Sequence, residues 1–190
     1  MNDADMNEGS GLYRERDAAR EEIVMADFLS TRAMAVIGAS NTKGKFGHLA
    51  FRELMARDFR VFPVNPHEKE ICGERCYHSI NELNDPIERI LILLPPVLTE
   101  QVVMELNPSI ISHVWMQNGA ESLGAMEICR KKGIRVIHGQ CILMHAEPVR
   151  SYHLLHRLWH EARPCKETNM SRISKLMKIK CLQEHRGDKI

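Results

Sequence analysis

The chain has 190 residues, of which 44% are hydrophobic and 27% charged, and its formal net charge is +1. This composition is typical of one globular domain with additional length, and it supplies enough apolar residues for a core without metals or disulfides. A net charge near zero and an aromatic content of 5% argue against nucleic acid and against an anionic membrane surface as partners.

The sequence divides into three regions with different patterns. Residues 1–19 are polar and are expected to form a disordered lead-in. Residues 20–148 alternate between strand and helix patterns and are expected to form one domain. Residues 149–190 are expected to form a helical extension, His-rich and then basic, which is too short for a second α/β domain.

Strands and helices alternate along the central region, beginning with a short amphipathic helix at about 20–30. Five apolar, β-branched-rich segments indicate strands buried on both faces: Met34–Ile37, Phe59–Val64, Arg89–Leu94, Ser112–Met116 and Ile134–His138. Helical patterns lie between them at His48–Arg57, Ser79–Leu83 (a capping-box start), Pro96 to about Leu106, and Glu121–Lys132 before Gly133. Without an Asn-Gly hairpin, this alternation predicts an α/β fold, a Rossmann-like doubly wound sheet of about five parallel strands.

The loop after the first strand has the composition of a phosphate-binding loop. It runs from Gly38 to Gly47 and leads into a helix. Glycine lets backbone amides approach an oxyanion, the helix N-terminus adds partial positive charge, and hydroxyl and ammonium groups lie between the glycines. The residues expected to contact the ligand here are Gly38, Ala39, Ser40, Lys43, Gly44, Lys45 and Phe46. The alternative is a tight turn that holds no ligand.

Two further strand ends narrow the choice of ligand. The glycine spacing of the loop is G-x5-G-x2-G, which differs from the G-x-G-x-x-G of NAD-binding units. The second strand ends in Pro63-Val64-Asn65-Pro66 without the acidic residue that holds ribose in such units, although Glu68 keeps NAD open. Lys69 suits a second phosphate, such as a 3′-phosphate. Pro95-Pro96 at the third strand end is either a simple helix start or a flat wall for an adenine.

Together these segments resemble the small, stand-alone CoA-binding domain proteins of the YccU-like type. The resemblance rests on AVIGAS at 35–40, FPVNP at 62–66, the segment Cys72 to Ile80, the prolines at 95–96, WMQNG at 115–119, and Cys141. It covers roughly residues 22–148. The same domain is similar to the nucleotide-binding half of the α subunit of succinyl-CoA synthetase.

This resemblance implies coenzyme A as the cofactor, with its phosphates on the loop that begins at Gly38. It places the ADP portion against Asn65–Lys69 and the adenine on Pro95–Pro96, with Gln117 and Gly119 nearer the pantetheine arm. Beyond the loop, the implied binding residues are therefore Pro63, Asn65, Pro66, Lys69, Pro95, Pro96, Gln117 and Gly119. The ligase domain that supplies a phosphorylated histidine is absent from the sequence, so ligase chemistry by this chain alone is not expected.

Cysteine and histidine residues raise separate possibilities. The acidic, polar N-terminus lacks the apolar segment of a secretory signal, which favours a cytoplasmic protein whose six cysteines are thiols. Cys141, close to His145, is expected to be a small buried hydrophobe, with a redox or acyl role as the alternative. Cys72, Cys76 and His78 have the ligand types of zinc without the usual spacing. His153, His156 and His160 share one helix face, which favours a packing or partner-binding helix over a metal or pH-sensing site.

Three functions remain open at this stage. The first is a cytoplasmic protein that binds CoA or acyl-CoA without catalytic or metal-binding residues of its own. The second is a subunit of an acyl-CoA ligase that acts with a separate chain. The third is an NAD(P)-binding oxidoreductase or redox sensor. A protein partner or a homodimer through the C-terminal helix is also possible.

Overall fold

The computed structural model describes residues 19–148. The predictions for residues 1–18 and for the extension at 149–190, which include the three histidines of its predicted helix, lie outside the described residues. The described part begins with a helix at 19–30, which agrees with the amphipathic helix expected at about 20–30.

Within residues 19–148 the main sheet has five parallel strands in the order β2-β1-β5-β6-β7. They are β1 (Ala33–Ile37), β2 (Arg60–Val64), β5 (Arg89–Ile92), β6 (His113–Gln117) and β7 (Arg135–Gln140). The predicted Rossmann-like fold is therefore confirmed, and each strand lies within two residues of its expected bounds. After β1 the chain adds β2 on one side of it and later adds β5, β6 and β7 on the other side. The strand order therefore reverses direction between β1 and β5.

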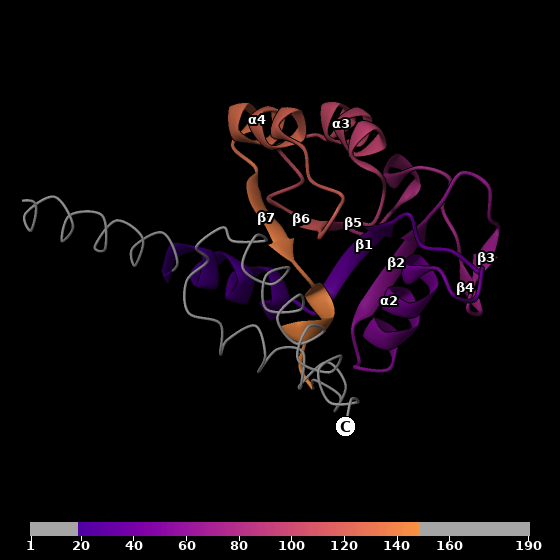
Figure 1. Ribbon diagram of the computed structural model, residues 1–190. Helices are drawn as coiled ribbons and strands as arrows, with labels where there is room; N and C mark the ends of the chain where they lie inside the picture. The colour runs from indigo at the N-terminus through magenta and orange to yellow at the C-terminus, as the bar shows by residue number, and fades with distance from the viewer. Residues whose placement is uncertain (1–18, 149–190) are drawn as a thin grey trace, which may run out of the picture. The chain divides into compact units, whose positions relative to one another are not determined.

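Helices cover both faces of this sheet (Figure 1). The labelled helices are α2 (Phe46–Met55), α3 (Pro96–Glu105) and α4 (Leu123–Lys132). Two short 3₁₀ turns lie before α3 and after β7, η1 (Ile80–Glu82) and η2 (Ile142–Met144) respectively. On one face α3 and α4 pack over a core that includes Val103 and Cys129. On the other, α2 and the helix at 19–30 pack over Trp115. The continuous apolar strands are explained by this two-sided burial.

A small hairpin departs from the expected alternation. Strands β3 (Glu70–Ile71) and β4 (Glu74–Arg75) pair antiparallel, and the turn between them has positive φ at Cys72 (54°) and Gly73 (90°). Positive φ at both central residues is typical of a type I′ turn, which Asn-Gly usually forms. This hairpin was not expected from the sequence, because Cys-Gly is not a dipeptide that indicates a type I′ turn.

The capping box expected at Ser79 also differs from the structure. Ser79 Oγ accepts a hydrogen bond from the Asn81 N–H, and the Glu82 carboxylate accepts one from the His78 N–H. The segment is a single 3₁₀ turn, because the chain enters β5 only a few residues later and leaves no room for a longer helix.

Asp27 anchors the helix at 19–30 to the amino ends of three strands. Its carboxylate accepts hydrogen bonds from Arg89 at 3.0 Å and from Arg135 at 2.6 Å, and it lies 3.1 Å from His113 Nε2. Burial opposes ionisation of Asp27, but these three partners hold the pKa of its carboxyl below the usual value. The neighbouring Phe28 ring packs edge-on against Trp115 with centroids 5.4 Å apart.

This anchor predicts a stability that falls with acidification. Burial lowers the pKa of His113 below 6.5, and Asp27 offsets this only in part. Between the folded-state pKa and about pH 6.5 the unfolded chain binds more protons, so the free energy of unfolding decreases as the pH falls through that window. Urea unfolding at a series of pH values measures the slope. The His113→Gln variant is expected to flatten it, whereas the exposed His138→Gln control keeps it. An unchanged slope in His113→Gln would contradict the assignment.

Candidate ligand-binding site

The carboxyl ends of β1, β2 and β5 meet at one edge of the sheet. The Gly38 N–H donates to the Val64 carbonyl at 3.1 Å, and the Leu93 N–H donates to the Ile37 carbonyl at 2.9 Å. These bonds continue the strand pairing beyond the strands themselves and join the three ends. In an open α/β sheet, ligands bind outside the carboxyl ends of strands where the topology reverses, which is this edge.

Gly38 occupies a position that only glycine fits. Its φ is +91°, and a Cβ built there would lie 2.9 Å from Leu94 Cδ2 and 3.2 Å from the Leu93 carbonyl carbon. Both the backbone conformation and the close approach of the third strand end therefore require the absence of a side chain.

Gly47 brings α2 close to the end of β1. A Cβ on Gly47 would collide with the carbonyl oxygen of Gly38. Only a residue without a side chain allows the first turn of the helix to rest directly on the strand end. Lys45 is the N-cap of this helix and, among the described residues, its side chain makes no capping hydrogen bond. The His48 N–H donates to the Lys45 carbonyl, so the N–H groups of Phe46 and Gly47 are the ones available to an anion, next to the exposed side chains of Lys43 and Lys45.

Asn65 holds the β2 end against the loop that follows β1. Its Nδ2 donates to the Ala39 carbonyl at 2.8 Å, and its Oδ1 accepts from the His67 N–H at 2.9 Å. Its own backbone N–H donates to the Tyr77 carbonyl. The side chain that was expected to contact the ADP portion thus positions two loops around the crevice.

Asn41 joins the same loop to the β3–β4 hairpin. Its Nδ2 donates to the Glu70 carbonyl at 2.5 Å and to the Glu68 carboxylate at 3.2 Å, while its Oδ1 accepts from the Cys72 N–H at 3.2 Å. Loop and hairpin are therefore held as one unit at the edge of the site.

Two hollows flank this loop. A cavity of about 430 Å³ lies between the three strand ends and α3, and it is lined by Ile37, Gly38, Val64, Asn65, Pro66, His67, His78, Ser79, Ile80, Leu94, Leu98, Gln101, Val102 and Glu105. A groove of about 490 Å³ lies along the start of α2 and is lined by Lys43, Gly44, Lys45, Phe46, His48, Leu49 and Arg52. The first has the size of a small-molecule pocket, and the second is strongly cationic.

The structure brings most of the expected loop residues to these two hollows. Gly38, Asn65 and Pro66 line the cavity, and the segment from Lys43 to Phe46 lines the groove. Three expected residues are buried in the wall behind them: Ala39, Ser40 and Pro63. Ser40 Oγ accepts from the Thr42 N–H and shapes the loop.

Other expected residues lie outside both hollows. Lys69, Pro95, Pro96 and Gly119 are exposed and line neither of them. The Gln117 side chain is buried, and its Oε1 accepts from the Ile142 N–H at 3.2 Å, which ties the end of β6 to η2.

Three histidines line the two hollows, and of these the sequence included His67 only within the segment Asn65–Lys69, His78 only beside two cysteines as a zinc-type residue, and His48 not at all. His67 and His78 line the cavity, and His48 lines the groove. His48 could not be assigned to this site from the sequence, and neither could His78, because only the fold brings the start of α2 and the segment after β4 to this edge.

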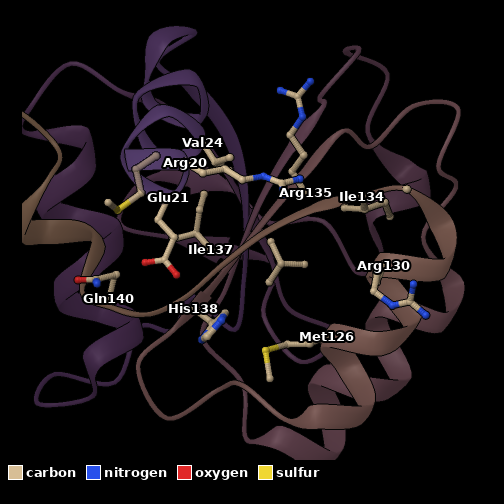
Figure 2. Close-up of a pocket in the computed structure, with 13 residues that line it drawn as sticks. Arg20, Glu21, Val24, Met126, Arg130, Ile134, Arg135, Ile137, His138 and Gln140 are labelled. Atoms are coloured by element: carbon tan, nitrogen blue, oxygen red, sulfur yellow. The ribbon is translucent and has the colours of Figure 1, made fainter. Parts of the chain in front are cut away.

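A third cavity, of about 580 Å³, is lined by a different set of residues and is shown in Figure 2. It runs along β7, between the helix at 19–30 and α4, and Val24, Met126 and Ile137 are among its apolar residues. None of the residues expected to bind the cofactor lines it. It is therefore separate from the crevice at the strand ends.

The remaining candidates were the cysteines and a possible metal site. Burial raises the pKa of the Cys76 thiol, and it raises that of Cys129 to about 11. Cys141 is half-buried against the apolar core. Within residues 19–148 no group of three or more histidine, cysteine or acidic side chains is arranged to hold a metal ion. None of the described helices has the length and hydropathy needed to span a bilayer.

Fold and site define a Rossmann-like domain with a glycine-rich, cationic loop at the point where the strand order reverses. The chain belongs to the CoA-binding domain family, which matches residues 32–147. The resemblance drawn from the motifs is thereby confirmed.

Known proteins share this domain over part of their length. The chain is 29% identical over 119 residues to an ADP-forming acetate–CoA ligase of Methanocaldococcus jannaschii, covering 58% of the chain and 17% of the ligase. It is 30% identical over 126 residues to the α subunit of ADP-forming acetate–CoA ligase II of Pyrococcus furiosus, covering 60% and 28%. A solved conserved hypothetical protein from Pyrococcus furiosus shares 35% identity with a TM-score of 0.56, over 58% of this chain and 96% of that one. The chain thus spans less than a third of each of these ligases.

Proposed function

We propose that this protein binds coenzyme A or an acyl-CoA at the crevice formed by the ends of β1, β2 and β5, without catalysing a reaction of its own. The observation that carries the proposal is the uncapped start of α2, which rests on the end of β1 beside Lys43 and Lys45, between a cavity and a cationic groove. Free helix N–H groups and ammonium groups suit a diphosphate, and the adjoining cavity has room for an adenine.

The end of β2 supports CoA over NAD. Asn65 stands where a dinucleotide-binding domain has an acidic residue, and its side-chain oxygen is already used by the His67 N–H. Lys69 lies a few residues after Asn65, exposed outside the cavity, and its charge would suit a 3′-phosphate. The cytoplasmic location, and a partner or second copy bound through the extension at 149–190, stay predictions.

A second candidate function is a subunit of an acyl-CoA ligase that acts with a separate chain. It is favoured by the likeness to an α subunit of an acetate–CoA ligase, of which this chain spans 28%. The test is reconstitution with chains that carry the remaining ligase domains. No gain of ligase activity in any such mixture would remove this candidate.

Removal of the two loop lysines is expected to weaken CoA binding strongly. Hydrogen bonds to charged groups contribute about 1.5–3 kcal/mol each, so Lys43→Ala combined with Lys45→Ala is expected to raise the Kd for CoA by tenfold or more. Calorimetry at one fixed salt concentration measures the change. Lys131→Ala, which removes an exposed lysine at the end of α4, is the matched control and is expected to leave the Kd unchanged.

The same titrations with a ligand panel decide between the cofactors. CoA, dephospho-CoA, NAD and NADP are compared with the unmodified chain, and CoA is expected to bind most tightly. Tighter binding of NAD than of CoA would reject the proposal, and so would a CoA affinity that the double lysine variant retains in full.

A further inference from the structure

Cys72 and His48 form a thiol–imidazole pair behind the loop that follows β1. Cys72 Sγ lies 3.8 Å from His48 Nδ1, and the same nitrogen lies 3.2 Å from the carbonyl oxygen of Ser40. A carbonyl oxygen only accepts, so Nδ1 carries the hydrogen. The sulfur of Cys72 is then placed 3.8 Å away as a second acceptor for this N–H group.

The imidazole of this pair faces a cationic groove, and the thiol lies beside it, partly exposed. Cys72 is half-buried in the turn of the β3–β4 hairpin. His48 lines the groove of about 490 Å³, and the lining also includes Lys43, Lys45 and Arg52. Several cations around an open groove raise the local concentration of an anionic reagent.

The two fully buried cysteines lack these properties. Burial raises the pKa of both Cys76 and Cys129, which disfavours their thiolates. Cys141, for which a redox role was the alternative expectation, is half-buried against the same apolar core as Cys72 but does not share its contact with an imidazole nitrogen. Among the four cysteines within residues 19–148, the contact with an imidazole at the edge of a cationic groove therefore distinguishes Cys72.

We propose that Cys72 is a modification site at which an anionic low-molecular-weight disulfide forms a mixed disulfide with the protein. The Cys72 thiol loses its proton to solvent, the Nδ1–H of His48 donates to the thiolate sulfur, and the thiolate attacks one sulfur of the reagent R–S–S–R. A bond forms between Cys72 Sγ and that sulfur as the S–S bond of the reagent breaks. The leaving thiolate R–S⁻ takes up a proton from solvent, so Cys72 is oxidised and one half of the reagent is reduced.

The modification would control the ligand site, a consequence that rests on the proposed function. Asn41 holds the turn that contains Cys72 to the loop after β1, and His48 contacts the Ser40 carbonyl in the same loop. An added group on Cys72 would displace these contacts and place further negative charge beside the loop lysines. Both effects oppose the binding of CoA phosphates.

The test follows modification of the full chain by glutathione disulfide, with peptide mapping to assign the modified cysteine. Cys72 is expected to react at least about tenfold faster than Cys141, and His48→Gln, whose amide can still donate to Ser40, to slow Cys72 about tenfold. Cys72→Ser is expected to abolish modification of that peptide, whereas Cys141→Ser leaves its rate unchanged. The combined Lys43→Ala and Lys45→Ala variant is expected to slow the reaction with glutathione disulfide but not with the cationic disulfide cystamine.

Equal reaction rates at Cys72 and Cys141, or a rate at Cys72 that His48→Gln does not change, would overturn the proposal. The modification is measured in the absence of CoA, so it does not depend on the proposed function. CoA affinity is then measured separately on the glutathionylated protein and after reduction with dithiothreitol. Modification without any CoA binding in either state would reject the proposed function and leave the modification site standing.

Discussion

Replacing Arg57 with methionine is expected to lower the free energy of unfolding by about 3–5 kcal/mol, because it removes one partner of a buried ion pair. The Arg57 side chain is fully buried, and its guanidinium lies 3.5 Å from the buried Glu53 carboxylate. The same guanidinium donates to the carbonyls of Leu143 at 2.8 Å and Ala146 at 2.7 Å. Methionine fills a similar volume but satisfies neither the carboxylate nor the two carbonyls.

Arg52, on α2 just before the turn that contains Arg57, provides the matched control. Its side chain is 60% exposed, and its guanidinium approaches Glu53 only at 3.9 Å. Surface pairs of this kind contribute about 0–1 kcal/mol, so Arg52→Met should have little effect. Urea unfolding of both variants at one pH gives the comparison. Similar losses in the two variants would mean that the buried guanidinium does not hold η2 to α2.

Gly47→Ala is expected to destabilise the domain and to weaken ligand binding together. Its Cβ would meet the Gly38 carbonyl oxygen, a backbone atom that cannot move away without shifting β1. Forcing one extra carbon into a packed position costs about 1–3 kcal/mol, and the displaced helix would carry its free N–H groups away from the site. We expect at least a tenfold rise in the Kd for CoA, measured by calorimetry on protein shown to be folded by circular dichroism.

Gly124 makes a fair comparison, because it too is the second residue of its helix. A Cβ there would meet the carboxylate of Glu100, the end of a flexible side chain. Gly124→Ala is therefore expected to change stability only slightly. The small cost of moving the Glu100 side chain is offset by the helix propensity of alanine, which exceeds that of glycine by about 1 kcal/mol. If Gly47→Ala behaves like Gly124→Ala in both stability and affinity, close packing of α2 on β1 is not what builds the site.

Much of the scaffold could be predicted from the sequence, because its signals are local. Continuous apolar runs locate the five strands, Gly133 ends α4 with φ +72°, and Gly38 marks the turn after β1. The hairpin could not be predicted, since its turn places Cys72, a residue without turn preference, at positive φ. A local pattern reports on backbone preferences and not on an unusual residue that tertiary contacts hold in place.

Only part of the candidate site could be predicted from the sequence in the same way. Loop residues such as Lys43 were recognisable from glycine and charge, but His48 and Cys72 are 24 residues apart and come together only through the hairpin. Asn65 and Gln117 were expected to contact the ligand; Asn65 does line the cavity, but both side chains also hold backbone groups of neighbouring loops. Residue type alone does not tell a contact to ligand from a contact that positions a loop.

The Asp27 anchor also bears on the order in which this domain can form during synthesis. Asp27 and Arg135 are 108 residues apart, and Arg57 is 89 residues from Ala146. Contacts this distant in sequence form slowly, because the entropy of closing a long loop must be overcome first. During translation the helix at 19–30 is made well before β7, and β7 supplies Arg135, the last cationic partner of Asp27. The domain completes its fold only when nearly all of it has been translated.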